Sequence, residues 1–129
     1  LKKDGYIFIE YPQYDSLESK ILGKYWLQLD IPRHLVHFTR AGLARLAKRA
    51  NLKVVDQKGV MSYEYSPYCL LVSIIGILKL KPLNLRKGLI YNIPTFTYLI
   101  IFSPLAFFLE AIFHAAGQSP IGLAILRKK

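Results

Sequence analysis

The pattern of apolar and polar positions predicts a strand at the start of the chain. Residues 5–10 (GYIFIE) are rich in β-branched and aromatic side chains and show no clear alternation. Such an apolar run is typical of a buried strand in a parallel sheet. Pro12 follows the run and ends it, because proline has no N–H to donate to a ladder.

The next segment has the spacing of a short helix. Leu17, Ile21 and Leu22 recur at intervals that place them on one helical face. Asp15 precedes them and Glu18 follows three residues later, which is the spacing of a capping box. We therefore expect about two helical turns here, with both acids serving as helix caps rather than as catalytic groups.

A second helix and two more strands complete the α/β pattern. Thr39 is a favourable N-cap, and the apolar positions of residues 40–50 follow at helical spacing. Residues 52–61 predict a strand, and residues 121–126 predict another. The order strand, helix, loop, helix, strand indicates a β-α-β crossover within a parallel sheet.

Two long apolar runs interrupt this pattern before the last strand. Residues 68–80 are shorter than a membrane span, whereas residues 93–113 are long enough to span but contain Pro94, Pro104 and Glu110. Between the runs lies a basic loop with Lys79, Lys81, Arg86 and Lys87. Three arrangements remain open: helices at or dipping into a bilayer surface, a lid packed over the sheet, and a two-span hairpin.

Composition and charge narrow the class of protein. The 129 residues include 18 Lys and Arg against 8 Asp and Glu, and 53% are apolar, which excludes a disordered chain. The single cysteine, Cys69, excludes an internal disulfide framework and is expected to fill apolar space in a reducing, cytoplasmic compartment. The formal charge of +10 is spread along the chain without a base-reading motif, so no nucleic-acid partner is expected.

The sharpest cluster of chemical side chains lies in residues 24–38. His34 and His37 are placed to act as a base or to orient a substrate, and Arg33 to bind an anion, in the crevice beyond the carboxyl end of the first strand. The structural alternative pairs Arg33 with Asp30 or Glu10 and has His34 bind backbone groups. No metal is expected, because the His-x-x-His pair lacks further ligands nearby.

Two aromatic residues precede this cluster. Tyr25 and Trp26 are candidates for the lining of a substrate pocket, and the alternative is that they cover a sheet edge.

The same region carries a family resemblance. Residues 26–39 (WLQLDIPRHLVHFT) resemble the W-x-x-L-D-x-P-R-H-L-x-H-F segment found in one branch of the class I S-adenosylmethionine-dependent methyltransferases. Residues 1–10 are similar to the entry into that family's fifth strand. Residues 121–129 are similar to its closing strand, which often ends in a basic dipeptide.

The resemblance implies a fold class and a division of the chain. The fold would be α/β, the C-terminal part of a Rossmann-like methyltransferase sheet with an apolar helical insertion before the last strand. Residues 1–67 and 117–129 would belong to the sheet domain, and residues 68–116 would form the insertion as a lid or a membrane-associated element. The S-adenosylmethionine site would lie in a preceding N-terminal half, because this chain has no Gly-x-Gly-x-x-Gly turn.

The function implied is methyl transfer to a small or lipid-linked acceptor. His34 would be the catalytic residue, and the acceptor would contact Tyr25, Trp26, Arg33 and His37. The chain alone is expected to be inactive, to be cytoplasmic, and to contact a membrane peripherally through residues 68–113. The alternative from another class is a non-catalytic, membrane-associated interaction module.

Overall fold

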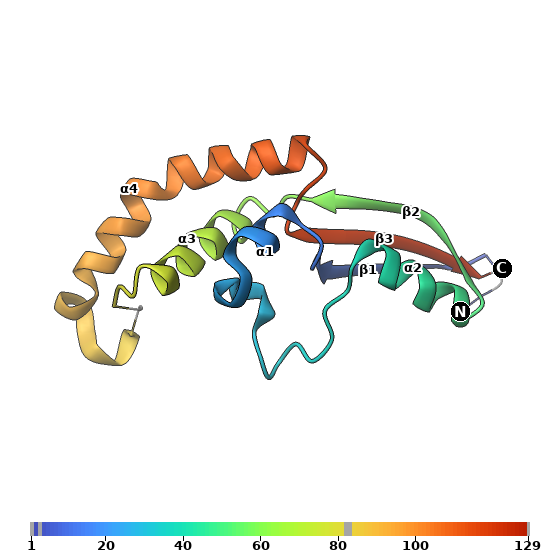
Figure 1. Cartoon of the computed structure of the whole chain (residues 1–129), viewed down its shortest axis with the longest axis horizontal. Coiled ribbons are helices and arrows are strands. Elements are labelled where there is room, and N and C mark those ends of the chain that lie inside the picture. Colours follow the sequence, from blue (N-terminus) through green and yellow to red (C-terminus); the bar gives the residue numbers. More distant parts are fainter. Residues whose placement is uncertain (1, 3, 82–83, 129) are drawn as a thin grey trace.

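The computed structural model describes residues 2, 4–81 and 84–128. The expected similarities at Leu1, Lys3 and Lys129 lie outside these residues. Figure 1 shows the sheet and α2 at one end of the molecule and α1, α3 and α4 at the other. The elements are β1 (Tyr6–Pro12), α1 (Leu17–Leu22), α2 (Arg40–Arg49), β2 (Leu52–Val60), α3 (Ser66–Ile77), α4 (Gly88–Ala115) and β3 (Ile121–Lys128). Short 3-10 turns span Gly23–Tyr25, Leu27–Leu29 and Leu85–Lys87.

The three strands form one sheet in the order β1-β3-β2. β3 pairs antiparallel with both neighbours, so β1 and β2 run parallel to each other without touching. The fold is therefore mixed α/β, as expected. The expected parallel sheet is wrong, and this strand order is not that of a Rossmann-like sheet, because the last strand of the chain lies between the first two.

β1 is half-buried rather than fully buried, which corrects the prediction for residues 5–10. Along β1, Ile7, Ile9 and Tyr11 face the core, whereas Tyr6 and Phe8 are exposed on the opposite face. The alternation follows from the pleat, which sends successive side chains to opposite faces. α2 covers the first of these faces, and among the described residues no helix covers the second (Figure 1).

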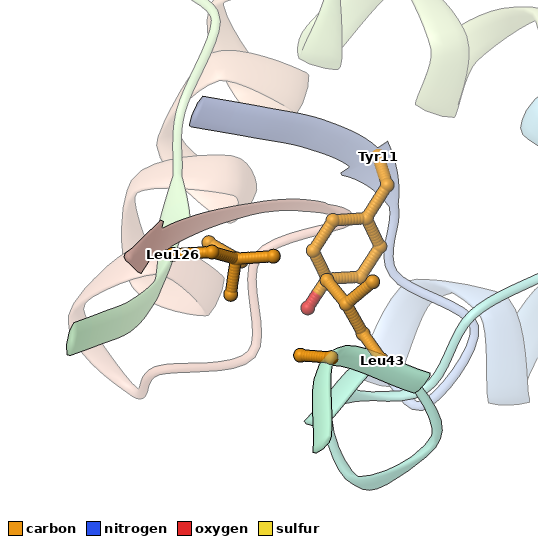
Figure 2. Packing of buried hydrophobic residues seen from close by; sticks show 5 residues of the cluster. Tyr11, Leu43 and Leu126 are labelled. Carbon is orange, nitrogen blue, oxygen red and sulfur yellow. The ribbon is translucent and has the colours of Figure 1, made fainter. Parts of the chain in front are cut away.

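The core of the sheet end forms between α2 and the covered face. Tyr11, Leu43 and Leu126 meet there from three different elements (Figure 2), together with Ala47 and Ala124. α2 begins where predicted, because the Thr39 hydroxyl accepts a hydrogen bond from the Gly42 N–H at 3.0 Å. Asn51 follows the helix with a φ of 57°, as expected for a residue that ends a helix in the left-handed region.

Tyr11 also links the two outer strands directly. Its ring crosses over Gly122 of β3, and its hydroxyl accepts a hydrogen bond of 2.8 Å from the Gln57 amide on β2. A Cβ atom added at Gly122 would lie 2.6 Å from the Tyr11 ring, which no real contact allows. Glycine at position 122 is therefore required for this bridge across the central strand.

α1 forms where predicted but is capped and oriented differently. Ser16 is the N-cap, accepting from the Ser19 N–H, while Asp15 accepts a hydrogen bond from the Arg40 N–H at the start of α2. Ile21 is exposed, and Glu18 is buried at 1% exposure. The predicted apolar face is therefore wrong, since the buried face of this short helix is mainly polar.

Both apolar runs form helices, and these pack as an antiparallel hairpin beside α1 (Figure 1). Their core contains Leu22, Trp26, Leu70, Leu71 and Ala106. α4 continues through Pro94 and Pro104 for 28 residues. Pro12, Val60 and Ile121 are register partners, so the hairpin leaves the sheet and returns to it at the same edge.

Candidate functional site

The carboxyl ends of β1 and β2 meet at one edge of the sheet. At that edge lies a cavity of about 250 Å³. It is lined by the end of β1, the start of β3 and side chains of the two following loops: Glu10, Tyr11, Pro12, Gln28, His34, Tyr65 and Ile121. Crevices at the carboxyl ends of parallel strands are the usual ligand sites of α/β proteins.

His34 is held in this cavity by a backbone contact. Its Nδ1 lies 3.0 Å from the carbonyl oxygen of Gln28, and a carbonyl can only accept. Nδ1 therefore carries the proton, and in the neutral ring Nε2 keeps its lone pair. No hydrogen bond to Nε2 occurs among the described residues. The arrangement gives His34 the tautomer that a general base requires.

His37 and Arg33 have local partners of their own. His37 donates from Nε2 to the Leu29 carbonyl at 2.9 Å and stacks at an angle on Tyr14. Arg33 pairs with Asp30 at 2.7 Å, and its side chain is 80% exposed. The Arg33–Asp30 pair and the contact of His34 with the Gln28 carbonyl match the structural alternative stated above. They position the loop around His34 and leave Arg33 at the surface, away from the lining of the 250 Å³ cavity.

Tyr25 and Trp26 lie on the opposite side of the same segment. Tyr25 is partly exposed and packs against α3, where a Cβ added at Gly76 would lie 3.3 Å from the tyrosine ring. Trp26 is buried at 1% exposure in the core of the helical end. Both line a second, larger cavity of about 650 Å³, described below, and neither lines the His34 cavity.

Tyr65 is a site residue that the sequence did not indicate. It lines the His34 cavity, and its interaction with the Cys69 thiol, followed by burial, raises the pKa of Tyr65 to about 12. Burial raises the pKa of Cys69 to about 12 as well. The thiol therefore stays protonated and unreactive near neutral pH, consistent with its predicted role as an apolar filler.

A pair of buried carboxyl groups joins the hairpin to the rest of the chain. Glu18 of α1 and Glu110 of α4 are each 1% exposed and face one another. Burial, followed by the charge of Glu110, raises the pKa of Glu18 to about 9, while the Trp26 indole opposes the shift. Burial also raises the pKa of Glu110, and the hydrogen bond from Glu18 lowers it. Burial therefore favours the protonated form of both carboxyls, and the folded chain keeps a proton within the pair.

The sequence indicates one member of this pair and not the other. Glu110 is the only acid in a long apolar run, and an isolated acid of that kind usually faces protein. Glu18 has the spacing of a capping-box residue, so its sequence position does not indicate a buried carboxyl. Its partner comes from the far end of the chain, which no local pattern reveals.

The outer face of the hairpin is apolar and uncovered. α4 is long and apolar enough to cross a membrane, and 11% of its most apolar window is buried. Large side chains there are mostly in solvent, including Ile90 at 85% and Ile100 at 71% exposure. The turn between the helices carries exposed basic side chains, namely Lys79, Lys81, Arg86 and Lys87. Apolar faces of this extent mark a surface that meets a partner.

The same-edge connection limits how this hairpin can meet a bilayer. The 12 residues of α3 extend about 18 Å, less than the roughly 30 Å of a hydrocarbon core, whereas the 28 residues of α4 extend about 42 Å. If α4 crossed a bilayer on its way back to β3, α3 would have to cross the bilayer first, and α3 is too short to do so. β2 and β3 pair with each other, so both ends of the hairpin lie on one side.

Neither metal ligands nor similar proteins give a further indication of function. Among the described residues, no group of three or more His, Cys, Asp or Glu side chains is placed to hold a metal ion. No family model, curated protein or solved structure matches the chain. The arguments below therefore rest on the geometry and on the motif in residues 26–39.

The Glu18–Glu110 pair makes stability dependent on pH. A folded-state pKa of about 9, above the ordinary 4.5, means that the folded chain keeps a proton that the unfolded chain loses. The stabilisation is complete below pH 4.5 and is lost progressively as the pH rises towards 9. We expect Glu18→Gln to reduce this slope in denaturant unfolding measured across that range, leaving the part that the buried Glu110 contributes.

The exposed carboxyl of Glu10 provides the matched control, since Glu10→Gln should retain the slope. A Glu18→Gln profile as steep as that of the wild type would show that the two carboxyls do not share a proton.

Proposed function

We propose that this chain is the C-terminal part of a methyltransferase that uses S-adenosylmethionine and acts on a lipid-linked acceptor at a membrane surface. The observation that carries the proposal is the His34 cavity. The segment that resembles the methyltransferase motif lies over the carboxyl ends of β1 and β2, with His34 lining the crevice. That is where an α/β enzyme of this class would place its acceptor.

The sheet supports a larger domain in two ways. β1 and β2 run parallel, and residues 13–51 connect them as a crossover would. The face opposite α2 carries exposed Phe8 and Val55 beside half-buried Ile125. An α/β sheet normally buries such a face under a second layer of helices. The antiparallel β3 does not oppose a larger α/β sheet, because mixed sheets are common among large sheets.

The described residues offer no cradle for the methyl donor. The chain has no glycine-rich turn between a strand and a helix, so we place donor binding in a preceding part of the polypeptide. S-Adenosylmethionine would supply an electrophilic methyl group there. This chain would hold the acceptor and take its proton on His34 Nε2 as the nucleophilic atom attacks.

The apolar hairpin supports a lipid-linked acceptor on the cytoplasmic side of a membrane. Its exposed residues match a bilayer interior, and its basic turn matches anionic headgroups. The hairpin returns to the edge of the sheet from which it left. This favours a hairpin that lies in or dips into one leaflet over a hairpin that spans the bilayer. The soluble-lid arrangement would instead require these side chains to be covered by protein.

A second candidate function rests on the same hairpin. Without a donor cradle, the chain would be a non-catalytic module that attaches a partner to a membrane, with the sheet as its scaffold. The exposed apolar face of α4 favours this alternative equally. The two functions differ in the role of His34 and in whether a second layer covers the sheet, and the experiments below test these two points.

The catalytic role of His34 predicts a specific defect. In the protein encoded by the complete reading frame, His34→Asn should keep a donor towards the Gln28 carbonyl but lose the base. We expect turnover to fall about a hundredfold with unchanged S-adenosylmethionine affinity, measured by methyl transfer and by calorimetry. Absence of S-adenosylmethionine binding by the wild-type protein would reject the enzyme, and wild-type turnover in the variant would remove His34 from the site.

The larger domain predicts that Phe8 becomes buried. Phe8→Ala should cost about 3 kcal/mol of unfolding free energy in the longer protein, where a second layer covers it. In the 129-residue chain, where Phe8 is 66% exposed, the change should stay within about 0.5 kcal/mol. Leu35→Ala, at an 81% exposed loop position, is the control in both. Equal, small effects of Phe8→Ala in the two proteins favour the module.

Membrane contact through the hairpin is tested by flotation. Wild-type protein should float with phosphatidylcholine vesicles that contain phosphatidylserine, and less so in high salt. Replacing Ile90, Ile100 and Phe108 together by Gln should lower the floated fraction at least tenfold, because these side chains are 85%, 71% and 62% exposed. Leu35→Gln should float normally. Undiminished flotation of the triple variant would place the membrane contact elsewhere.

A further inference from the structure

A groove runs between residues 24–31 and the inner side of the helical hairpin. Its cavity of about 650 Å³ falls within the range of ligand sites. The walls are mostly apolar and come from both sides, including Tyr25, Trp26, Leu27, Val72, Ile75 and Leu99. The His34 cavity lies on the other side of the same chain segment, since Leu27 and Leu29 line the groove while Gln28 lines the His34 cavity.

The groove continues under the tip of the hairpin. A neighbouring cavity of about 280 Å³ shares Ile75, Leu80 and Thr95 with it and is otherwise lined by Lys81, Pro94 and Tyr98. The Thr95 hydroxyl donates to the Lys81 carbonyl at 2.8 Å, so it presents no free donor to this space. The two cavities share three lining residues and are both mostly apolar, so an apolar chain longer than one cavity could occupy both.

The mouth of the groove is positively charged. Lys24 and Lys79 line it and are exposed, and neither has an acidic partner within the described part of the chain. Asp30, the one acid that lines the groove, is already paired with Arg33 at 2.7 Å. The Lys24 ammonium lies 5.2 Å from the centre of the Tyr25 ring, a contact that leaves its charge without a counter-ion. An apolar cavity lined by two cations that have no acidic partner in the described part of the chain is complementary to an amphiphile with an anionic head.

We propose that this groove binds the hydrocarbon chain of an anionic membrane lipid, with the lipid headgroup at Lys24 and Lys79. The assignment rests on the proposed function, because it names the class of acceptor. Exposed Ile31 and Leu80 line the mouth, next to the hairpin surface that would meet the bilayer. A lipid can therefore enter without leaving an apolar environment, and its head stays beside the segment that carries His34.

Trp26 provides a built-in probe, since it is the only tryptophan and lines the groove. Titration of the chain with decyl phosphate below its micellar concentration should change Trp26 emission saturably. Octyl phosphate should bind more weakly, by about three- to fourfold for each methylene removed. Decyl phosphocholine should bind several-fold more weakly than decyl phosphate. Saturable binding of inorganic phosphate with the same affinity would overturn the proposal, because the groove would then contribute nothing.

Two variants locate the site. Val72→Phe fills the groove and should weaken decyl phosphate binding at least tenfold, while Ile100→Phe, outside both cavities, should not. Far-UV circular dichroism checks the fold of each variant. Lys24→Gln combined with Lys79→Gln changes only exposed side chains, and it should remove the preference for the phosphate head over phosphocholine. The proposal would be overturned if Val72→Phe bound decyl phosphate with wild-type affinity and the double lysine variant kept the wild-type preference for the phosphate head.

Different results would overturn the lipid-binding groove and the proposed function. Val72→Phe leaves the outer hairpin face and the sheet intact, so flotation and S-adenosylmethionine binding by the longer protein should remain normal. Normal values of both, with no decyl phosphate binding by the wild type, would overturn the groove alone. Loss of S-adenosylmethionine binding with groove binding retained would overturn the enzyme and leave a lipid-binding module.

Discussion

The position of β3 is the constraint on which the rest of the structure depends. It is the one described strand that pairs along both edges, and it comes last in the chain. The sheet therefore cannot close until α3 and α4 have returned the chain to the edge from which they left. Such non-local pairing makes the loop-closure cost large. The Tyr11–Gln57 bridge over Gly122 then fixes the two outer strands around the central one.

This constraint also brings the apolar hairpin and the candidate catalytic residue together. The hairpin begins and ends at the edge of the sheet that carries the His34 cavity. Residues 24–34 lie between that cavity and the hairpin groove, and they are tied to the hairpin by the bond from the Leu27 N–H to the Ser73 hydroxyl. The buried Glu18–Glu110 pair adds a second tie. A ligand held by the hairpin would therefore be held at a defined position relative to His34.

Local signals in the sequence predicted local structure well. Thr39 capped α2, Asn51 took the left-handed conformation, and residues 121–126 formed a strand. These features depend on interactions within a few residues, so the sequence alone determines them. The residue types at 33–37 likewise marked a segment that does line a cavity.

The remaining features depend on partners distant in the chain. A short apolar run such as residues 5–10 does not distinguish parallel from antiparallel neighbours, and β3 lies antiparallel between the two strands that were expected in a parallel sheet. Glu18 fitted a capping pattern, yet it is buried against Glu110. In each case the deciding contact is tertiary, and no periodicity encodes it.

The outer edge of β1 has a practical consequence. Within the described residues, β1 pairs only with β3, so the backbone amides and carbonyls along its other side point outward from a flat, aromatic strand. Natural proteins protect such an edge with charge, proline or a covering element, because it otherwise recruits a strand from another molecule. Produced in isolation, these 129 residues would self-associate through that ladder, and their solubility would report whether a neighbouring strand normally occupies it.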